Sequence, residues 1–336
     1  MKRTALAALA LLTAAAVAAP SAGAATAPTV TVITRNLYVG ANILPLATSQ
    51  KGEQFEKAAG KVLDEVDATE PDARMKLMAK EIADARADFA NLQEVTTWLT
   101  GPKDDPADAG DVRWDYLATL LKELKALGRR YYVAASTRNL DAEGPTDRGV
   151  DVRFFTGNVM LVRKGIHVDR SSSGDFKSQL VIPTLALGNV ETTRGWNAVD
   201  FTVAGHRGRV VNAHPEAYSP DIRLKQTKEL IKGPLKSSRQ VILAGDLNTG
   251  PKLPKKEDRP PYLALAKAGF VPRRTPKPNC CFEDDLTTGK WDHVVDWVMT
   301  KPGLTLVRSF ISGTATTPSG LHASDHGSVV STLRLR

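Results

Sequence analysis

The sequence predicts a mixed α/β fold in which strands and helices are layered around one extended hydrophobic core. Segments that alternate apolar and polar residues, or that stay apolar for a few residues, are interleaved along the chain with segments of helical periodicity. Without a leader of 25 residues, about 310 residues remain, which could form two average domains but are also within reach of one large layered domain. We therefore expect a single domain over residues 29–336, preceded by a short leader.

The first 25 residues are typical of a secretory signal peptide. Two basic residues precede an apolar run over residues 5–19, and small residues around 22–24 form a cleavage site. A transmembrane anchor is the alternative, but this 15-residue run is shorter than the roughly 20 residues that a spanning helix needs. We expect cleavage near Ala24 or Ala25, secretion of the remaining chain, and no transmembrane segment in it.

The charge balance indicates a class of partner. Lys and Arg number 45 against 37 Asp and Glu, a net charge of +8, of which about six positive charges remain after the leader. A positive surplus suits an anionic partner such as a nucleic acid or a phospholipid headgroup. The excess is spread along the chain, so it does not locate a binding site. We expect the chain to be a monomer.

The first elements after the leader are a strand, a helical region and a second strand. The segment TVTVITRNLYVG (29–40) alternates apolar and β-branched residues with polar ones, which predicts a strand that ends near Asn36. Apolar residues three and four apart predict helix from 51 to 88. DFANLQEV then predicts a buried strand that ends on Glu94, and Pro, Gly and Asp predict a surface loop at 101–111 without core residues.

The rest of the chain continues this alternation. Apolar residues at helical spacing predict an amphipathic helix over 114–127 that Gly128 terminates. The remaining predicted elements are strands at 129–137, 150–163, 197–203 and 208–214, a helix at 222–235, a strand at 240–248, a helix at 262–268, and strands at 292–300 and 327–336. Several of these strands end on an Asn, Glu, His or Asp side chain.

Cys280 and Cys281 are the only cysteines. Neighbouring Cα atoms are about 3.8 Å apart across a trans peptide, below the usual range for a disulfide. A vicinal disulfide and two free thiols are both compatible with the sequence, and in either state the fold depends on its hydrophobic core. Together with His293 the cysteines offer too few ligands for a zinc site.

The polar side chains at the strand ends have a structural as well as a chemical interpretation. Asp246 and Asn248 follow a strand, where such side chains often hydrogen-bond to their own backbone and form a turn. Glu94 can be a surface carboxylate, although apolar neighbours place it in an otherwise buried run. His214 can be a histidine at the edge of a sheet. Local structure explains each of them when it is considered alone.

Two further groups favour the chemical interpretation. The segment ASDHGS (323–328) can be a polar loop, but Asp296 stands between Val295 and Trp297, and a charge inside an apolar strand needs a partner. Together the polar side chains supply carboxylates for a hard cation, two histidines, a carboxylate that can orient one of them, and two amides that can hold phosphate or water. This set is typical of metal-assisted phosphoester hydrolysis.

The ordered motifs resemble those of a known superfamily. In chain order they are RNLYVG, ANLQEV, VVNAHPEAY, VILAGDLNTG, DHVVDWV and ASDHGS. Each is short, but their order and their places at strand ends resemble the endonuclease/exonuclease/phosphatase superfamily, which includes DNase I, exonuclease III, neutral sphingomyelinases and inositol polyphosphate 5-phosphatases. The resemblance covers about residues 30–335. It implies a four-layer α/β sandwich of two mostly antiparallel sheets packed face to face, with helices outside and the site at one end of the sheets.

The resemblance also implies a metal site. Glu94 is the expected principal ligand of Mg²⁺, for which Mn²⁺ is a possible substitute. Asn36 is expected beside Glu94, where it supports the metal or a phosphate oxygen, and Asp325 next to the metal. Tyr38 stands where some nucleases have a second acidic ligand, so we expect a single ion held mainly by Glu94. The long interval between Asn36 and Glu94 indicates an extra helix at one edge of the fold.

The remaining implied roles are catalytic. His214 contacts the scissile phosphate, Asp246 orients or deprotonates the attacking water, and Asn248 holds that water or a phosphate oxygen. Asp296 fixes the tautomer of His326. The ion and the imidazolium groups stabilise charge on the phosphoryl oxygens where it develops. The resemblance leaves open which group takes the proton of the water.

Many members of the superfamily also use a tyrosine or an arginine to contact the substrate phosphate. Arg153, in DVRFFTGNVML, is the candidate, and its alternative is a solvated arginine at the edge of a strand. The predicted function is a secreted Mg²⁺-dependent phosphoester hydrolase of the phosphodiesterase or nuclease type. The alternatives are a sphingomyelinase-like phospholipase C, which needs an exposed apolar element, and a binding module of the same fold without catalysis. SFISGTATTPSGLHA is an unconvincing membrane-binding hairpin.

Overall fold

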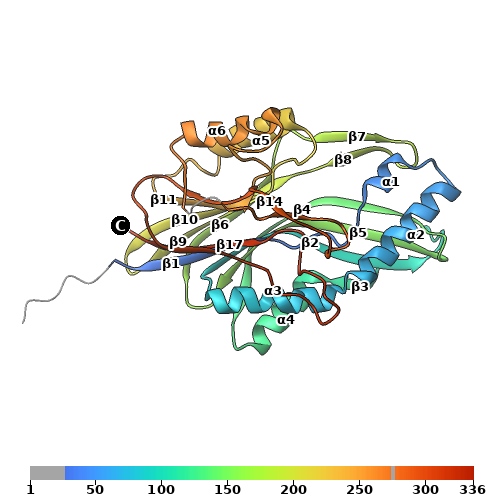
Figure 1. Cartoon of the computed structure of the whole chain (residues 1–336), viewed down its shortest axis with the longest axis horizontal. Coiled ribbons are helices and arrows are strands. Elements are labelled where there is room, and N and C mark those ends of the chain that lie inside the picture. Colours follow the sequence, from blue (N-terminus) through green and yellow to red (C-terminus); the bar gives the residue numbers. More distant parts are fainter. Residues whose placement is uncertain (1–26, 274–276) are drawn as a thin grey trace, which may run out of the picture.

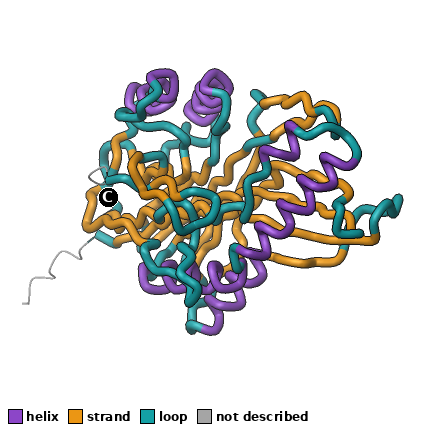
Figure 2. Tube along the Cα trace, turned by 45° about the vertical axis from the view of Figure 1, so that its right-hand side comes forward, coloured by secondary structure: helices purple, strands orange, loops and turns teal. Residues whose placement is uncertain are grey.

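The computed structural model describes residues 27–273 and 277–336, so the predicted signal peptide at 1–25 lies outside the described residues. Two large sheets pack face to face, and helices cover their outer faces (Figures 1 and 2). The prediction of a four-layer α/β sandwich is therefore confirmed. Within the described ranges, no helix is long and apolar enough to cross a membrane.

The first sheet has seven strands. In spatial order they are β16 (Thr305–Ser312), β17 (Ser328–Arg334), β1 (Thr29–Asn36), β2 (Phe89–Pro102), β5 (Val150–Arg163) and β4 (Tyr131–Pro145), with β3 (Asp111–Asp115) paired to β2. All neighbours run antiparallel except β1 and β2, which run parallel.

The second sheet has six strands and repeats this mixed pattern. In order they are β12 (Val271–Pro272), β15 (Asp296–Thr300), β11 (Gln240–Asp246), β10 (His206–Ala213), β9 (Gly195–Val203) and β6 (His167–Asp175). Only β10 and β11 run parallel among these pairs. Two small hairpins stand apart, β7 (Leu180–Thr184) with β8 (Gly188–Thr192), and β13 (Cys280–Phe282) with β14 (Gly289–His293).

Three hydrophobic clusters fill the three interfaces between the layers. Val32 and Phe89 of the first sheet meet Phe201 and Ile242 of the second, and the rings of Phe89 and Phe201 are 4.8 Å apart between centroids. The outer face of the first sheet packs against α2 (Glu53–Ala68), α3 (Pro71–Ala85) and α4 (Tyr116–Ala126). The outer face of the second sheet packs against α5 (Pro220–Lys232) and α6 (Pro260–Lys267). The short α1 (Leu44–Thr48) and the 3₁₀ turn η1 (Lys256–Asp258) complete the described helices.

Two predicted elements are divided in the structure. The helix expected over 51–88 is α2 followed by α3, because Glu70 has a left-handed backbone with φ of 49° and Pro71 starts the second helix. The strand expected over 292–300 is interrupted after His293, so that β14 pairs with β13 and β15 pairs with β11. In both places tertiary pairing and backbone geometry cut an apolar pattern that is continuous in the sequence.

Other elements differ in extent. β2 continues to Pro102 instead of ending on Glu94, and Trp114 belongs to β3 instead of the following helix. The predicted surface loop contains one core residue, Ala109, which is buried. β6, β7 and β8 were not predicted, because their residues are mostly exposed and partly polar and give no clear apolar alternation.

Candidate active site

The site lies at one end of the two packed sheets, where strand direction brings distant segments together. β1 and β2 run parallel, so Asn36 at the end of β1 lies beside Gln93 of β2. β10 and β11 also run parallel, and they lead directly to His214 and Asp246. β15 is antiparallel to β11, so its first residue, Asp296, pairs in register with Asp246. β17 is antiparallel to β1, which places the loop before β17 at the same end.

Glu94 is turned toward the site by an irregularity in β2. The strand bulges between Leu92 and Val95, and Glu94 has a left-handed backbone with φ of 53°. A bulge redirects a side chain, and a non-glycine residue with positive φ is uncommon and often lies at a functional site. Its carboxylate accepts hydrogen bonds from Asn36 Nδ2 at 2.9 Å and from the Val39 backbone N–H at 3.0 Å. The Glu94 carboxylate is thus fixed in place by two donors.

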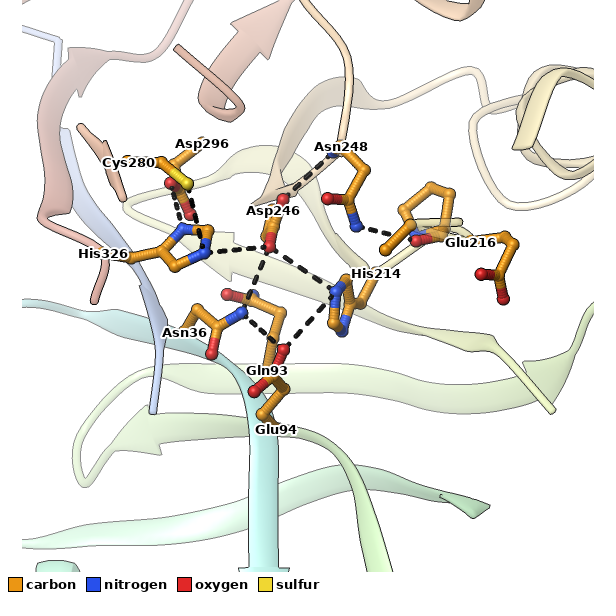
Figure 3. A network of polar contacts seen from close by, with 12 residues as sticks. Asn36, Gln93, Glu94, His214, Glu216, Asp246, Asn248, Cys280, Asp296 and His326 are labelled. Carbon is orange, nitrogen blue, oxygen red and sulfur yellow. Dashed lines mark hydrogen bonds and ion pairs between the residues drawn. The ribbon is translucent and has the colours of Figure 1, made fainter. Parts of the chain in front are cut away.

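Asp246 lies at the centre of the polar network drawn in Figure 3. Its Oδ2 accepts a hydrogen bond from Asn36 Nδ2 at 3.1 Å and lies 3.5 Å from His214 Nε2 and 3.8 Å from His326 Nε2. Its Oδ1 accepts from the backbone N–H of Asn248 at 3.0 Å. Burial opposes the charge, but His326 and the hydrogen bonds from the Asn248 backbone and from Asn36 lower the pKa of Asp246 below its usual range. Asp246 is therefore a buried carboxylate that stays ionised.

Asn248 forms the turn after β11 and also joins the site to the loop after β10. It has a left-handed backbone with φ of 49°, and Asn tolerates this conformation better than most residues. Its side-chain Nδ2 donates to the Pro215 carbonyl at 3.0 Å. GDLN is therefore both a turn and part of the site, because the same backbone conformation places Asp246 and Asn248.

His326 and Asp296 form a tight buried pair. His326 Nδ1 is 2.8 Å from Asp296 Oδ2. Burial, with the charge of Asp246, raises the pKa of Asp296 to about 6. Burial also opposes a charge on His326, but the carboxylates of Asp296, Asp325 and Asp246 raise the pKa of His326 well above its usual range. The pair is therefore an imidazolium and a carboxylate at neutral pH, with His326 Nε2 directed toward Asp246.

Asp325 and Glu94 face one cavity beside this network. Asp325 Oδ2 is 3.8 Å from His326 Nε2, and its Oδ1 accepts from Ser324 Oγ at 3.0 Å. Burial, followed by the charge of Asp325, raises the pKa of Glu94. A cation placed between the Glu94 and Asp325 carboxylates would favour the ionised form of Glu94.

The donor set fits a hard divalent cation. Mg²⁺ prefers oxygen ligands, keeps several waters and needs only one or two carboxylates, which Glu94 and Asp325 supply. Asn36 directs its Nδ2 at Glu94 and Asp246, and its Oδ1 accepts from the Tyr38 backbone N–H at 2.9 Å. Asn36 therefore positions the carboxylates through its amide nitrogen. Asp246, Asp296 and His326 are all buried and also bring ligand atoms within 4.8 Å of one another.

Arg194 reaches the site although no sequence motif predicts it there. Its Nη1 lies 3.2 Å from His214 Nδ1. A guanidinium can only donate, so His214 Nδ1 is the acceptor and the His214 proton lies on Nε2, facing Asp246. Burial and then the charge of Arg194 lower the pKa of His214 to about 3. Burial and Arg194 thus favour the neutral form of His214, whose Nε2–H is the donor.

Arg194 also forms an ion pair with the buried Glu216. The Arg194 Nε lies 3.5 Å from Glu216 Oε2. Arg194 precedes β9 in a segment with no apolar alternation or turn motif that singles it out. Only the pairing of β9 with β10 brings it beside His214.

Arg153 does not reach this network. It lies in β5 opposite Leu99 of β2, and its Nε is 2.8 Å from Asp141 Oδ1, while its Nη1 is 2.8 Å from Asp108 Oδ2. The hydrogen bond from Arg153 to Asp141 raises the pKa of Arg153 and lowers that of Asp141. The structure places Arg153 in a surface ion-pair cluster, and Arg194 is the arginine beside the site.

Buried amides join the two sheets under the site. Asn91 Nδ2 donates to the carbonyl of Ala244 at 2.7 Å, and Gln93 Nε2 donates to Asn212 Oδ1 at 2.7 Å. Asn212 Nδ2 donates back to the carbonyl of Leu92 at 3.0 Å. Because an unpaired buried polar group is costly, these bonds specify how the two sheets are aligned where the site residues emerge.

Three fully buried arginines hold the loops of the site by their carbonyls. Arg35 donates to the His326 carbonyl. Arg74 donates to the carbonyls of Leu37 at 2.9 Å and Ala323 at 3.0 Å. Arg223 donates to the carbonyl of Glu216 at 3.0 Å. Each guanidinium thus ties a loop that carries site residues to the body of the fold.

Cys280 and Cys281 are joined as a vicinal disulfide. Their sulfur atoms lie 3.5 Å and 3.7 Å from His326 Nε2, and Figure 3 shows Cys280 above the His326 ring. The open alternative of two free thiols is thus not the state of this structure. The disulfide therefore packs beside the Nε2 atom of His326.

The fold and this arrangement of acids, imidazoles and amides define the class of protein. The family model described as the Endonuclease/Exonuclease/phosphatase family matches residues 49–326, so the chain belongs to this family. Members of the family are metal-dependent phosphoesterases. The comparison with curated proteins gives no match.

Solved structures agree with the fold. A family protein from Beutenbergia cavernae is 18% identical with a TM-score of 0.57, over 91% of this chain and 72% of that one. One from Bacteroides thetaiotaomicron is 13% identical with a TM-score of 0.57, over 92% and 99%. D. rerio TDP2, complexed with a single-strand DNA product, is 16% identical with a TM-score of 0.53, over 91% and 98%. At these identities the likeness concerns the fold alone.

Proposed function

We propose that the chain is a secreted, Mg²⁺-dependent phosphodiesterase that works as a monomer, with residues 29–336 as its catalytic domain. The observation that supports this most directly is the continuous network from Glu94 through Asn36 to Asp246, which both His214 and His326 approach. All of these groups come from one chain and face one end of the sheets. A structural polar cluster needs no such set of acids and bases around an accessible cavity.

The reaction is an in-line attack of water on phosphorus. The water oxygen forms a bond to phosphorus, the bond from phosphorus to the leaving oxygen breaks, and the electron pair of that bond remains on the leaving oxygen. The ionised Asp246, fixed by Asn36 and the Asn248 backbone, accepts a hydrogen bond from the attacking water and takes the proton that this water loses, while solvent protonates the leaving oxygen. His214 presents an Nε2–H to a phosphoryl oxygen, and His326 presents its Nε2–H to the same region.

Glu94 and Asp325 are the residues that hold the metal in this proposal, with Mn²⁺ able to replace Mg²⁺. The metal supplies Lewis-acid stabilisation of the phosphoryl oxygens. Arg194 adds a fixed positive charge beside His214 and takes the phosphate-binding role first assigned to Arg153. A guanidinium suits this role because its donors form a planar fork.

Two alternatives differ in what they require. A binding module without catalysis needs no ionised, precisely held acid, yet every carboxylate and imidazole expected by family resemblance is present and in contact. A sphingomyelinase-like phospholipase C needs an apolar surface beside the phosphate site. The cavity lined by Glu94, Arg194, Leu44 and Leu187 favours that substrate class.

The test is hydrolysis of a panel of phosphodiesters by the purified chain. Plasmid DNA, RNA, sphingomyelin and a chromogenic phosphodiester are each assayed with Mg²⁺ and with EDTA. Asp246→Asn keeps the shape of the side chain and removes its charge, and we expect kcat to fall by about 100- to 10,000-fold. Asp84→Asn on the exposed face of α3, where Asp84 pairs only with Lys80, is the matched control and should keep full activity.

Two results would overturn the proposal. One is the absence of metal-dependent turnover on every substrate of the panel. The other is full activity in Asp246→Asn with an unchanged melting temperature, since a spectator carboxylate gives that result. The order of rates within the panel then shows which anionic substrate class, nucleic acid or lipid, the protein prefers.

A further inference from the structure

A cavity of about 320 Å³ extends from the site between α1 and the β7–β8 hairpin. Its polar end is lined by Glu94, Asp325 and Arg194, the groups assigned above to the metal and the phosphate. The cavity is therefore continuous with the position of the reacting phosphorus. A group that occupies the cavity is therefore attached to the phosphoester or lies directly beside it.

The opposite wall of the cavity is aliphatic. It is formed by Leu44 and Leu46 of α1 and by Ile182, Leu187 and Val190 of the hairpin segment. Figure 1 shows α1 and the β7–β8 hairpin side by side at one edge of the molecule, and α1 is in contact with β7. Two small elements that pack little against the main core thus build an apolar wall beside a charged site.

The rim of this wall is exposed to solvent. Leu185 at the hairpin turn is 69% exposed, and Val181 is 50% exposed. Leu44 and Leu187, which also line the cavity, are 46% and 38% exposed. Exposed aliphatic side chains on the two elements that form the cavity mark a surface suited to an apolar ligand or a lipid surface.

The same wall carries no positive charge. Residues 42–50 and 180–192 contain no Lys or Arg, although binding of nucleic acid relies on cations that contact successive phosphates. These two segments also contain no aromatic side chain on which a base could stack. An aliphatic wall without cations or aromatic rings is therefore suited to a hydrocarbon group and poorly suited to a polynucleotide.

We infer that the substrate is an amphipathic phosphodiester whose hydrocarbon portion enters the cavity between α1 and the β7–β8 hairpin while its phosphate lies at Glu94, Asp325 and Arg194. The exposed Val181 and Leu185 contact the lipid surface from which such a substrate is drawn. This inference rests on the proposed function, because it assigns the group next to the phosphoester that is cleaved. It places the specificity for the substrate on two elements that the sequence did not single out.

The first experiment varies only the hydrocarbon group. Methyl, butyl and octyl p-nitrophenyl phosphate share one leaving group and are assayed with Mg²⁺ below the concentrations at which they aggregate. We expect kcat/KM to rise along the series, by up to about fourfold for each methylene that becomes buried in the cavity. The methyl ester reports on the chemistry without the apolar contact.

Three variants locate the contact. Leu187→Asp places a charge in the cavity wall and should flatten the dependence of kcat/KM on chain length. Leu185→Asp changes the rim outside the cavity lining, so it should keep the dependence on chain length and lose most of the activity on phosphatidylcholine vesicles. Val112→Asp, at a 62% exposed position of β3, is the control and should change neither. Melting temperatures verify that each variant is folded.

The outcomes separate this inference from the proposed function. If the methyl ester is hydrolysed but kcat/KM does not increase with chain length, the inference is wrong and the function stands. If no ester of the series is hydrolysed with Mg²⁺ although another phosphodiester of the panel is, the inference is wrong; if nothing in the series or the panel is hydrolysed, the proposed function itself fails. If Leu187→Asp lowers hydrolysis of a single-stranded oligonucleotide as strongly as that of the octyl ester, the wall serves nucleic acid and the lipid assignment is overturned.

Discussion

At the scale of single residues, the site depends on how each ionisable side chain is partnered. Arg194 fixes the tautomer of His214 by occupying its Nδ1, whereas Asp296 holds the Nδ1 of His326. The two histidines therefore differ in charge state: His214 is neutral beside a guanidinium, and His326 is cationic beside carboxylates. Both direct Nε2 at Asp246, so two different kinds of donor meet at the same carboxylate.

Arg194→Met is expected to lower kcat by about 100-fold, because it removes a fixed positive charge and the hydrogen bond that orients His214. Arg153→Met removes a guanidinium of the surface cluster with Asp141 and Asp108, and it should leave kcat within about twofold. Steady-state kinetics on one chromogenic phosphodiester measure both. Equal losses in the two variants would contradict the assignment of Arg194 to the site.

At the scale of elements, two parallel strand pairs set the site inside sheets that are otherwise antiparallel. β10 and β11 must approach closely for His214 and Asp246 to meet, and Gly245 allows this approach. A Cβ atom at Gly245 would lie 2.1 Å from the Ala213 carbonyl oxygen, which is a backbone atom that cannot move away as a side chain could. In the first sheet, the bulge in β2 turns Glu94 toward the site.

Gly245→Ala is therefore expected to lower the free energy of unfolding by about 1–3 kcal/mol through overpacking, and to lower activity further by separating His214 from Asp246. Urea denaturation and kinetics measure the two effects. Gly110→Ala is the control, because the nearest atom to its added Cβ, the Asp108 carbonyl oxygen, is 3.9 Å away. A fully active and stable Gly245→Ala would show that the strand pair is not tightly constrained.

At the scale of the whole molecule, three interlayer cores support the fold, and buried polar groups align the site across it. Arg74 connects the end of β1 with the loop that carries Asp325, since it donates to the carbonyls of Leu37 and Ala323. Its guanidinium also donates to Tyr116 Oη of α4 at 3.2 Å. One buried side chain thus joins three segments that are far apart in sequence.

Arg74→Met is expected to lower the free energy of unfolding by at least about 1–3 kcal/mol, because buried carbonyl groups are left without a donor. The exposed Arg207 on β10 provides the control, and Arg207→Met should change stability by less than about 0.5 kcal/mol. Urea denaturation measures both. A similar small effect in the two variants would mean that water replaces the Arg74 contacts.

Metal binding gives a second prediction for the whole molecule. A ligand that binds only the folded chain stabilises it, by about 2.7 kcal/mol at a concentration 100 times its Kd. We expect Mg²⁺ to raise the melting temperature of the unaltered chain and EDTA to reverse this. In Glu94→Gln the increase should disappear, because the principal ligand has lost its charge. Retention of the full increase in Glu94→Gln would place the ion elsewhere.

The sequence by itself determined the fold class, the order of most strands and the identity of most site residues. Apolar periodicity identified strands such as β1, β5 and β11, because their alternation reflects burial against a core. The polar ends of these strands pointed to Asn36, His214 and Asp246. These features are local, and each can be recognised from neighbouring residues and from the resemblance to a known family.

Only the tertiary structure decided which charged side chains lie beside one another in the site. Arg194 and Arg153 are both arginines without a local signal, and the pairing of β9 with β10 selects Arg194. The cavity between α1 and the β7–β8 hairpin is likewise formed by segments more than a hundred residues apart, with no apolar pattern strong enough to predict it. Local patterns specify strands and their polar ends, whereas the meeting of side chains from distant strands depends on pairing and packing that no single segment encodes.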